Sequence, residues 1–505
     1  MKNFLTLLLI LSSFTVFAQI KEASAEIVYG DPISVGKNLE FYSKFRIIGK
    51  YENHFIVSKS YFRKRKEPHA TLFLIDKDLM IKKELNFSGQ FITFRQFGKN
   101  IIAFYTVQKK DPFQLEIYFL EINGETLEET NKGLLKTIET GKAPRPNGFL
   151  SFKESKPILN YFVYSKTTPR LDGEIDISLF PLQMNIKANM ATNTSWGPKS
   201  DYVRIGYGYS SVEEKISRFI KYRPDAGTYI MEELKTKHTI TDIDFIWEGD
   251  SIIIHGVYSD GGKNKNKKLL DNGIFVLIYS ISEEDLLDIQ WHQFTSDVSL
   301  YNIPLDQRDK RIKEGKTTSL HGLKAHGRHT HKNGEITYIY EQIYKYTHTD
   351  SQTGAKTTMT ATEAIVIIHH NENGNVLWEQ IIVKLQKLRP TEIQLSGGIN
   401  FCPYPDGSFG LFFNDDLKNY SVKPPKNTRP YTGTLKSPRG LILYNVNNKG
   451  ISNPEIIIDY TQKHLKAPLN PNRYIWNGKI LMYSNFKKQH SNKGTFQYVL
   501  IDLPY

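Results

Sequence analysis

The sequence holds a single cysteine, Cys402, among its 505 residues, so no disulfide can form within the chain. Small secreted scaffolds that depend on disulfides are therefore excluded, and the fold must be stabilised by ordinary burial of apolar surface. A chain of this length has ample surface to bury. Cys402 itself lies in an apolar run before a turn, which predicts a buried and unreactive thiol.

After its N-terminus the chain lacks any segment that approaches the roughly 20 apolar residues needed to cross a membrane as a helix. The N-terminus reads MKNFLTLLLILSSFTVFAQ, with Lys2 before an apolar run from Phe4 to Phe17 and a small-residue cleavage site at Ala18. This pattern predicts a signal peptide over residues 1–18. We expect a mature chain of residues 19–505 in the periplasm or outside the cell, without a transmembrane segment.

Linkers and helical patterns are also missing. No long Gly/Ser or Pro tract divides the chain, and no long run keeps apolar residues at helical spacing. Length alone suggests about three domains. Because no linkers separate them, we expect one domain over residues 19–505, interrupted by loop insertions, with little helix. We also expect a monomer.

Hairpins are what the sequence contains in place of helices. Runs rich in Ile, Val, Tyr and Phe alternate with Asn-Gly, Asp-Gly and Gly-Lys turns, which are hairpin signals. One form recurs, namely a strand, a tight Gly turn and a strongly apolar strand. It occurs at FRQFGKNIIAFY (94–105), FIWEGDSIIIHG (245–256), HTHKNGEITYIY (329–340), CPYPDGSFGLFF (402–413) and YIWNGKILMY (474–483).

A second hairpin follows the first in most units, after a variable loop. Four strands in each stretch of roughly 40 to 50 residues is the period of a β-propeller blade. Counting the second hairpins predicts an all-β fold, a single β-propeller of about eight four-stranded blades, or of seven if insertions inflate the count. A pair of antiparallel sandwiches is the alternative. Second hairpins begin near residues 70, 115, 217, 364 and 441.

The two ends of the chain fit the propeller interpretation. The last unit, TFQYVLIDLPY, supplies one clear strand before the sequence stops. A propeller can close by pairing a strand from one terminus into the blade begun at the other. The segment AEIVYG, Ala25–Gly30, has the residues for such a strand. We therefore expect the N-terminal strand to complete the last blade.

The segment NENGNVLWEQ, residues 371–380, resembles the end of a repeat in pyrroloquinoline-quinone-type propellers, because Gly374 precedes Trp378 by four positions. Other units replace the Trp, as by Lys83 or Glu128. More broadly, the hairpin pattern of the mature chain resembles that of exported bacterial β-propeller proteins. The resemblance implies a propeller and an exported location. It implies no catalytic residues, and we expect no cofactor.

Four histidines stand close together in HGLKAHGRHTHKNGEITYIYEQ, residues 321–342. On an alternating strand, His321, His329 and His331 share one face, and His326 falls on the other. A His-x-His pair can present two imidazoles to one zinc ion, so the first three are candidate metal ligands. Neighbouring Lys and Arg side chains oppose a cation. The alternatives are a polar wall that faces a channel or ligand and, favoured by the Asn-Gly turn, a partly solvated hairpin arm.

Basic residues exceed acidic ones, which gives a formal net charge of +13. Short basic runs are typical of solvated loops, but they can also steer an anionic partner to the surface. The expected partners are an anionic glycan, an envelope component or a protein. Nucleic acid is not expected, because no recognisable binding motif accompanies the charge. The candidate ligand-binding residues belong to one such run and are Lys263, Lys265, Lys267 and Lys268.

Motifs for other chemistry are weak. The segment GYGYSSV, residues 206–212, lacks the last Gly of a nucleophile elbow. A group of oxygen-bearing side chains follows an apolar strand, but it lacks the spacing of a calcium loop, so a turn is favoured. This group consists of Asn414, Asp415, Asp416 and Asn419.

The leading interpretation is a non-enzymatic, exported β-propeller that binds a ligand or protein through loops on one face. Rigid elements hold variable loops, and binding residues often lie on such loops. The loops over residues 260–272 and 420–438 are the best candidates, being long, polar and basic. The alternative is a hydrolase or lyase that acts on polysaccharide at the channel, and two inward carboxylates near His329 and His331 would favour it. A third possibility is a structural part of an envelope assembly.

Overall fold

The computed structural model describes residues 21–35, 44–61, 69–88, 90–110, 113–140, 145–153, 156–164, 171–177, 194–196, 202–207, 216–223, 228–235, 238–248, 251–264, 266–280, 283, 285–315, 318–389, 397–421, 428–432, 439–462, 469–476, 479–487 and 494–503. The predicted signal peptide over residues 1–18 lies outside these ranges, as does Lys265. Within these ranges, no helix has both the length and the apolar character needed to span a bilayer.

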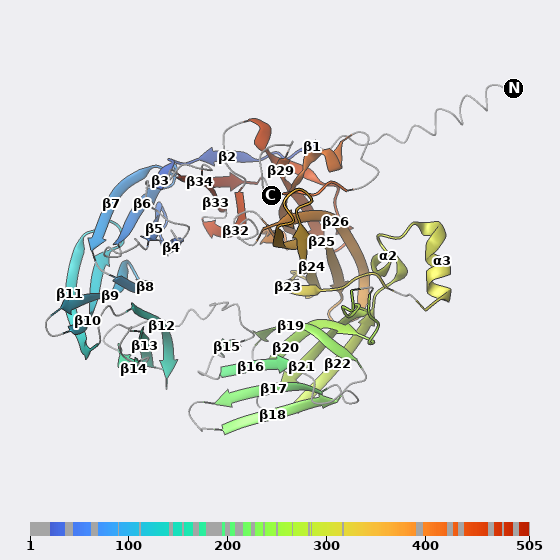
Figure 1. Ribbon diagram of the computed structural model, residues 1–505, viewed down its shortest axis with the longest axis horizontal. Coiled ribbons are helices and arrows are strands. Elements are labelled where there is room, and N and C mark those ends of the chain that lie inside the picture. Colours follow the sequence, from blue (N-terminus) through green and yellow to red (C-terminus); the bar gives the residue numbers. More distant parts are fainter. Residues whose placement is uncertain are drawn as a thin grey trace, which may run out of the picture.

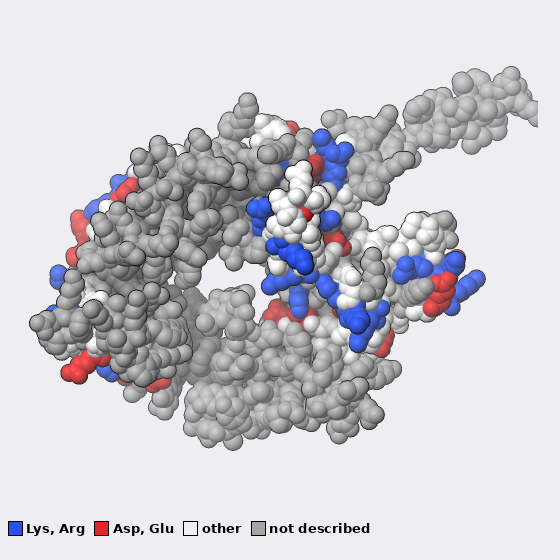
Figure 2. All heavy atoms as spheres, in the orientation of Figure 1, with Lys and Arg blue, Asp and Glu red and all other residues white. Residues whose placement is uncertain are grey.

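The described chain is built almost wholly of β-strands. They form eight separate sheets, which follow one another around a central opening (Figures 1 and 2). The first four sheets contain β4 (Lys44–Lys50), β5 (His54–Tyr61), β6 (His69–Asp76) and β7 (Ile81–Ser88); β8 (Gln90–Phe97), β9 (Asn100–Lys110), β10 (Phe113–Asn123) and β11 (Glu129–Glu139); β12 (Arg145–Lys153), β13 (Lys156–Tyr164) and β14 (Leu171–Asp176); and β15 (Thr194–Trp196), β16 (Tyr202–Tyr207), β17 (Ile216–Arg223) and β18 (Thr228–Lys235).

The other four sheets continue in chain order and take in the N-terminal strands. They contain β19 (Thr239–Glu248), β20 (Ser251–Ser259), β21 (Gly273–Ser280) and β22 (Asp285–Gln293); β23 (Leu323–Thr330), β24 (Ile336–Thr349), β25 (Lys356–His370) and β26 (Val376–Leu388); β27 (Asn400–Pro403), β28 (Phe409–Asp416), β29 (Arg439–Asn447), β30 (Gly450–Ile451) and β31 (Glu455–Asp459) with β1 (Lys21–Glu22); and β32 (Leu469–Trp476), β33 (Lys479–Lys487) and β34 (Gly494–Asp502) with β2 (Glu26–Tyr29) and β3 (Ile33–Val35).

The predicted hairpins are confirmed. All five hairpins of the first kind pair as antiparallel strands, as do the second hairpins that begin near residues 70, 115, 217, 364 and 441. Five of the sheets have the predicted four strands. The β12–β14 sheet has three described strands, and two sheets gain additional strands from the N-terminal segment.

The N-terminal strand pairs with the last strand of the chain, as expected. β2 runs antiparallel to β34, with Glu26 opposite Asp502 and Tyr29 opposite Val499. β3 pairs with the other part of β34. The pairing of β1 with β31, which is parallel, had no signal in the sequence. The first and last described strands are therefore held by backbone hydrogen bonds within the last two sheets.

The middle strands of the sheets are covered on both faces. A strand covered on one face alternates between buried and exposed residues, whereas continuous burial requires a neighbour on each side. Eight consecutive residues of β20 are buried, and so are all eight residues of β28. The outer strand β11, in contrast, is mostly exposed. This distribution explains the apolar runs Ile252–Ile254 of β20 and Phe409–Phe413 of β28.

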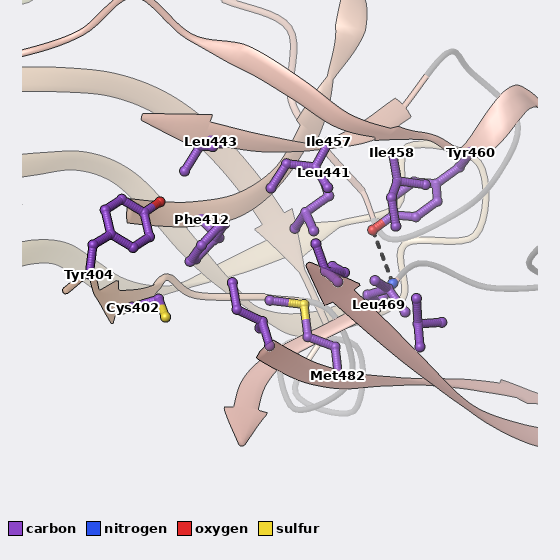
Figure 3. Close-up of a cluster of buried hydrophobic side chains, with 13 residues drawn as sticks. Cys402, Tyr404, Phe412, Leu441, Leu443, Ile457, Ile458, Tyr460, Leu469 and Met482 are labelled. Atoms are coloured by element: carbon purple, nitrogen blue, oxygen red, sulfur yellow. Dashed lines mark hydrogen bonds between the residues drawn. The ribbon is translucent and has the colours of Figure 1, made fainter. Parts of the chain in front are cut away.

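Apolar side chains from neighbouring sheets form the core. In one cluster, Phe412 and Leu441 of the β27–β31 sheet pack against Met482 and Val499 of the last sheet (Figure 3). Each large apolar side chain that is fully buried contributes about 1.5–3 kcal/mol relative to exposure. Cys402 belongs to this cluster and is buried, which confirms the prediction of a buried thiol.

The α-helices of the described residues lie in one insertion between β22 and β23, outside the sheets in Figure 1. They are α2 (Ser296–Ser299) and α3 (Leu305–Lys313). Pro304 stands directly before α3, where its fixed φ suits a helix start, and Gly315 adopts a φ of 71° just after its end. Two short 3₁₀ segments, η1 (Leu417–Tyr420) and η2 (Tyr460–Gln462), follow β28 and β31.

Candidate functional site

The β23–β26 sheet has two chemically different ends. Connections within an antiparallel meander alternate between ends, so the β23–β24 and β25–β26 turns lie at one end and the β24–β25 connection at the other. We call the first the tight-turn end, because both its turns are short. We call the second the long-loop end. The loop over residues 260–272 reaches the long-loop end, since Lys268 Nζ donates to Lys345 O across 3.3 Å.

The candidate lysines of that loop divide into two kinds. Lys263 and Lys267 are exposed, whereas Lys268 is half-buried and lies 4.5 Å from the centre of the Tyr344 ring. The loop itself is a defined turn, because Asn264 Oδ1 accepts from the backbone N–H groups of Asn266 and Lys268. Lys268 thus holds the loop against the neighbouring sheet, and the two exposed lysines are the ones available to a partner.

His321 lies at the long-loop end, before β23 begins, and not beside the other candidate histidines. Its ring centre is 4.7 Å from that of Tyr344. Gln342 Nε2 donates to His321 O at 3.1 Å. Burial lowers the pKa of His321, which keeps its ring neutral near pH 7.

Three tyrosines are linked to His321, one directly and two through Gln342 or Tyr344. Tyr301, from the helical insertion, donates to Gln342 Oε1 at 3.1 Å, and Tyr344 donates to the Glu363 carboxylate. Tyr346 follows on the same strand, with its ring centre 6.4 Å from that of Tyr344. All of these rings are half-buried. We call Tyr301, His321, Tyr344 and Tyr346 the tyrosine cluster.

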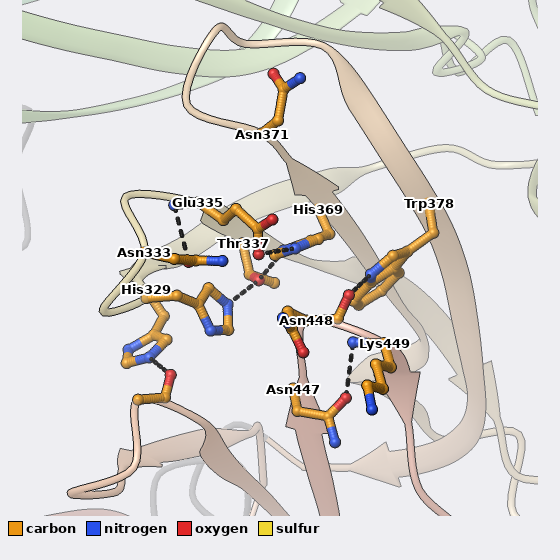
Figure 4. Close-up of polar contacts among 12 residues, drawn as sticks. His329, Asn333, Glu335, Thr337, His369, Asn371, Trp378, Asn447, Asn448 and Lys449 are labelled. Atoms are coloured by element: carbon orange, nitrogen blue, oxygen red, sulfur yellow. Dashed lines mark hydrogen bonds and ion pairs between the residues drawn. The ribbon is translucent and has the colours of Figure 1, made fainter.

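The tight-turn end holds the other candidate histidines (Figure 4). His329 and His331 are nearly buried, with ring centres 4.8 Å apart. His369, from β25, is fully buried, and its ring centre lies 5.0 Å from that of His331. The alternation that was expected to put His321 on the same face fails, because the β23–β24 register shifts between Ala325 and Gly327.

A chain of hydrogen bonds links these rings to a carboxylate. His331 Nε2 is 2.7 Å from Thr337 Oγ1, which is 2.9 Å from His369 Nδ1. His369 Nε2 is 3.1 Å from Glu335 Oε2. Hydrogen bonds from Asn333 hold the pKa of Glu335 below its usual value, and hydrogen bonding and charge interaction with His369 act in the same direction. Glu335 is therefore an acceptor at neutral pH.

The Glu335 carboxylate determines which group donates and which accepts in each of these hydrogen bonds. His369 Nε2–H donates to Glu335, and burial lowers the pKa of His369, so its Nδ1 carries a lone pair. Thr337 must then donate to that nitrogen and accept from His331 Nε2–H. Burial, followed by the neighbouring imidazoles of His329 and His369, lowers the pKa of His331 to about 4. The rings are neutral and each is hydrogen-bonded.

Cross-sheet bonds fix the same end. His329 Nε2 donates to Gly407 O of the β27–β28 turn at 2.8 Å, and Trp378 Nε1 donates to Asn448 O at 3.0 Å. The Trp378 ring also stacks on His369, with centres 5.0 Å apart. Within the described residues, no group of three or more His, Cys, Asp or Glu side chains is arranged to hold a metal ion. The structure uses these histidines as hydrogen-bonding core residues of neighbouring turns.

Buried charges occupy the middle of the sheet, and no motif in the sequence predicts them. Lys384 of β26 and Glu341 of β24 are both almost fully buried and form an ion pair. Asp415 lies close by on β28, where burial raises the pKa of its carboxyl group to about 7. Asn414, Asp415 and Asp416 were expected in a turn, but they are buried residues of β28. The local sequence does not predict this burial. The polar side chains of Asn-Asp-Asp can be buried only because partners far along the chain pair with them.

Comparisons with known proteins give no family. No protein-family model and no curated protein matches the chain, and the likeness of residues 371–380 to quinone-type propeller repeats gains no family match. Solved structures with a partial likeness include polysaccharide lyase Uly1, with a TM-score of 0.33, 10% identity and coverage of 96% of this chain and 100% of that one.

Two propellers show similar values. The Dos1 propeller has a TM-score of 0.26 and 8% identity over 94% of each chain. The β-propeller domain of the Trilobed protease from Pyrococcus furiosus has a TM-score of 0.22 and 9% identity, over 72% of this chain and 93% of that one. At such values the likeness carries no argument about activity, and the case for the fold rests on the sheets themselves.

Proposed function

We propose that the eight sheets are the blades of one exported β-propeller, closed by β2, which binds its partner through the long-loop end. Three features support a propeller. Each sheet is built on a meander of sequential strands, to which N-terminal strands add in the last two sheets. The middle strands β20 and β28 are covered on both faces, and β2 pairs with β34. Export rests on the signal-peptide pattern of residues 1–18.

The observation that carries the binding role is the tyrosine cluster. Polar side chains that serve only the fold are normally buried and paired, as at the tight-turn end. Tyr301 and Tyr344, in contrast, stay half-buried while hydrogen bonds hold their hydroxyl groups in place. Tyr presents a rigid apolar face with a polar tip, which suits it to contacts with sugars and proteins. The cluster is therefore a preformed surface.

The ligand class that fits best is an anionic glycan. Aromatic faces at Tyr344 and Tyr346 can cover the apolar side of a sugar ring, and Lys263 and Lys267 lie exposed on the adjoining loop. Positive charge near such a surface speeds encounter with an anionic partner and loses strength as salt rises. An envelope component or a protein with an acidic surface offers the same charge.

The test is binding of the mature chain to an array of acidic and neutral glycans, followed by titration of the best ligand. Two variants probe the site, Tyr346→Ala and the charge reversal Lys263→Glu with Lys267→Glu. We expect each to weaken binding at least tenfold without lowering the melting temperature. Lys132→Glu with Lys136→Glu, on the remote strand β11, is the matched control and should leave binding unchanged. Equal binding by all variants would remove the long-loop end from consideration.

One observation favours a second candidate, cleavage of polysaccharide. Hydrogen bonds connect Glu335 through His369 and Thr337 to His331. A general base is oriented by hydrogen bonds of this kind. A single carboxylate takes part, whereas glycoside hydrolysis uses two. The measurement is release of reducing ends or of unsaturated products from acidic polysaccharides. Activity that disappears in His331→Gln but survives Tyr346→Ala would favour the enzyme over the binding protein.

A further inference from the structure

We propose that the outer edge of β26 accepts an extended peptide segment of a partner protein as an added strand. This surface is separate from the long-loop end and does not depend on the function proposed there. β26 is the last strand of its sheet and pairs with β25 along one edge. An exposed strand edge offers a row of backbone donors and acceptors that another chain can pair with.

The outer edge already pairs once in this way. Tyr431 N donates to Leu385 O at 2.8 Å, and Lys387 N donates to Tyr431 O at 2.9 Å. The bridge is parallel and joins Gln386 to Tyr431. In the described part of the chain it is the one backbone pairing on this edge. Residues 379–383, earlier on β26, lie on the same edge beyond a register shift between Val383 and Gln386.

A cavity of about 700 Å³ runs beside residues 379–383. Successive residues of a strand point to opposite faces, so a cavity that touches all five must follow the edge of the strand and not one face. Its walls come from α2 on one side and from η1 and the β29–β31 region on the other. Five residues of extended chain cover roughly 16 Å, so the groove has room for a short strand.

The two sides of the groove differ in chemistry. Glu379 contacts His292 and Thr295, which places the odd-numbered side chains of this stretch toward α2. There Val298 and Ile381 form an apolar patch beside the carboxylates of Asp297 and Glu379. Val383 belongs to the same side and is 45% exposed, which leaves apolar surface uncovered.

The opposite side is aromatic and polar. Gln380 Oε1 accepts from Ile451 N at 3.0 Å, which places the even-numbered side chains toward β30. Tyr420, Tyr444 and Ser452 line this wall. Tyr420 is fixed from behind, because its hydroxyl donates to Asp415 Oδ2 at 2.7 Å.

The charged groups that line the cavity also limit which peptide can bind there. The two carboxylates of the cavity are already satisfied, since Asp297 accepts from Arg308 at 2.7 Å and Glu379 bonds His292 at 2.6 Å. An uncharged segment therefore fits better than an acidic or basic one. The occupant we infer is an extended peptide with apolar side chains at alternate positions, directed to α2, and small polar ones between them.

The probe is a fluorescein-labelled peptide with the core Thr-Val-Thr-Val-Thr-Val-Thr, measured by polarisation against the full chain. The matched peptide carries N-methyl groups on alternate residues, which removes ladder hydrogen bonds and leaves the side chains. Strand addition requires binding by the first peptide and at least a tenfold loss on methylation. Equal binding of both peptides, or binding of neither, would overturn the proposal.

Two protein variants locate the site. Val383→Lys puts a charge at the apolar wall of the groove and should weaken peptide binding at least tenfold. Leu377→Lys is the matched control, because Leu377 is 50% exposed on the same strand but does not line the cavity. Equal loss in both variants would refute the groove as the site. Displacement of the peptide by neutral oligosaccharides alone, with no effect of methylation, would make the cavity a sugar site instead.

Discussion

The two ends of the β23–β26 sheet treat polar side chains in opposite ways. At the tight-turn end, His331 and His369 are withdrawn from solvent and joined to Glu335 through Thr337. At the long-loop end, Tyr344 and Tyr346 remain half-buried. A buried polar group must be hydrogen-bonded or it costs stability, whereas a half-buried ring remains available for contact.

This difference shows that density of a residue type in the sequence is a poor guide to a site. The histidine-rich stretch marks a place where turns of neighbouring sheets lock together. The tyrosine cluster, in contrast, is assembled from an insertion, a loop and a strand that no local motif connects. The following experiments test whether the first end serves stability and the second serves binding.

The largest effect on the free energy of unfolding is expected at the buried ion pair of Lys384 and Glu341, which lies in the middle of the sheet. Lys384→Ala should cost about 3–5 kcal/mol, because it leaves a buried carboxylate without its partner. The double variant Lys384→Met with Glu341→Leu should recover most of this loss, since it removes both charges. Urea unfolding of the three proteins gives the comparison. A single variant that loses less than about 1 kcal/mol would mean that water reaches Glu341.

The tight-turn end should respond to acid. His331 has a pKa of about 4 in the fold, below the ordinary value of 6.5, so the unfolded state alone binds its proton between these values. Stability should therefore be fully present above pH 6.5 and fall as the pH drops toward 4, by about 3 kcal/mol from this residue.

The measurement is the free energy of unfolding from pH 7.5 to 4, compared between the wild type and His331→Gln. The variant should show a shallower fall, although it starts lower at pH 7.5. His348→Gln at the long-loop end is the matched control, because His348 is exposed. Identical slopes in all three proteins would contradict the buried, neutral assignment of His331.

Backbone strain gives a smaller contrast. Gly407 at the tight-turn end has a φ of 94°, and an added Cβ would lie 3.0 Å from Lys332 Cγ. Gly407→Ala should cost about 1–2 kcal/mol, because L-residues avoid this conformation. Gly354 at the long-loop end has a φ of 69° and open space around it, so Gly354→Ala should cost less. Thermal unfolding ranks the two, and a larger loss at Gly354 would reverse the comparison.

The smallest expected effect is a gain in stability from a substitution in the loop over residues 260–272. Lys267 adopts a φ of 60°, which is unfavourable for a residue with a Cβ. Lys267→Gly should relieve that strain and stabilise the protein by roughly 0.5 kcal/mol, because the entropy that Gly loses on folding offsets part of the gain. A rise of a degree or less in melting temperature would agree with this, and a clear fall would show that the lysine side chain supports the loop.

The sequence predicts strands well here because hairpin signals are local. The turn residues of FRQFGKNIIAFY and NENGNVLWEQ stand beside the strands they join, and Gly374 has the positive φ that its turn requires. The pairing of β2 with β34 was also predictable, since a lone final strand needs a partner. The parallel addition of β1 to β31 was not, because nothing in two residues specifies it.

The site was predicted less well, because its partners are remote in the sequence. Alternation placed His321 with His329, but a one-residue register shift breaks the alternation between them. Lys268 looked like a free cation, and its packing on Tyr344 depends on a contact 76 positions further along. The burial of Asp415 depends on Tyr420 and Asn419, which hydrogen-bond it from a 3₁₀ turn that has no distinct sequence signal.

The pairing of β2 with β34 has a consequence for biosynthesis. A ribosome releases the segment around Ile27 early, but its antiparallel neighbour around Ile501 lies 474 positions further along the chain. Until β34 has been synthesised, the backbone groups of β2 have no partner and can pair with another nascent chain. A chaperone that delays the folding of β2 would therefore protect the chain. Removal of residues 499–502 would leave β2 without its antiparallel neighbour.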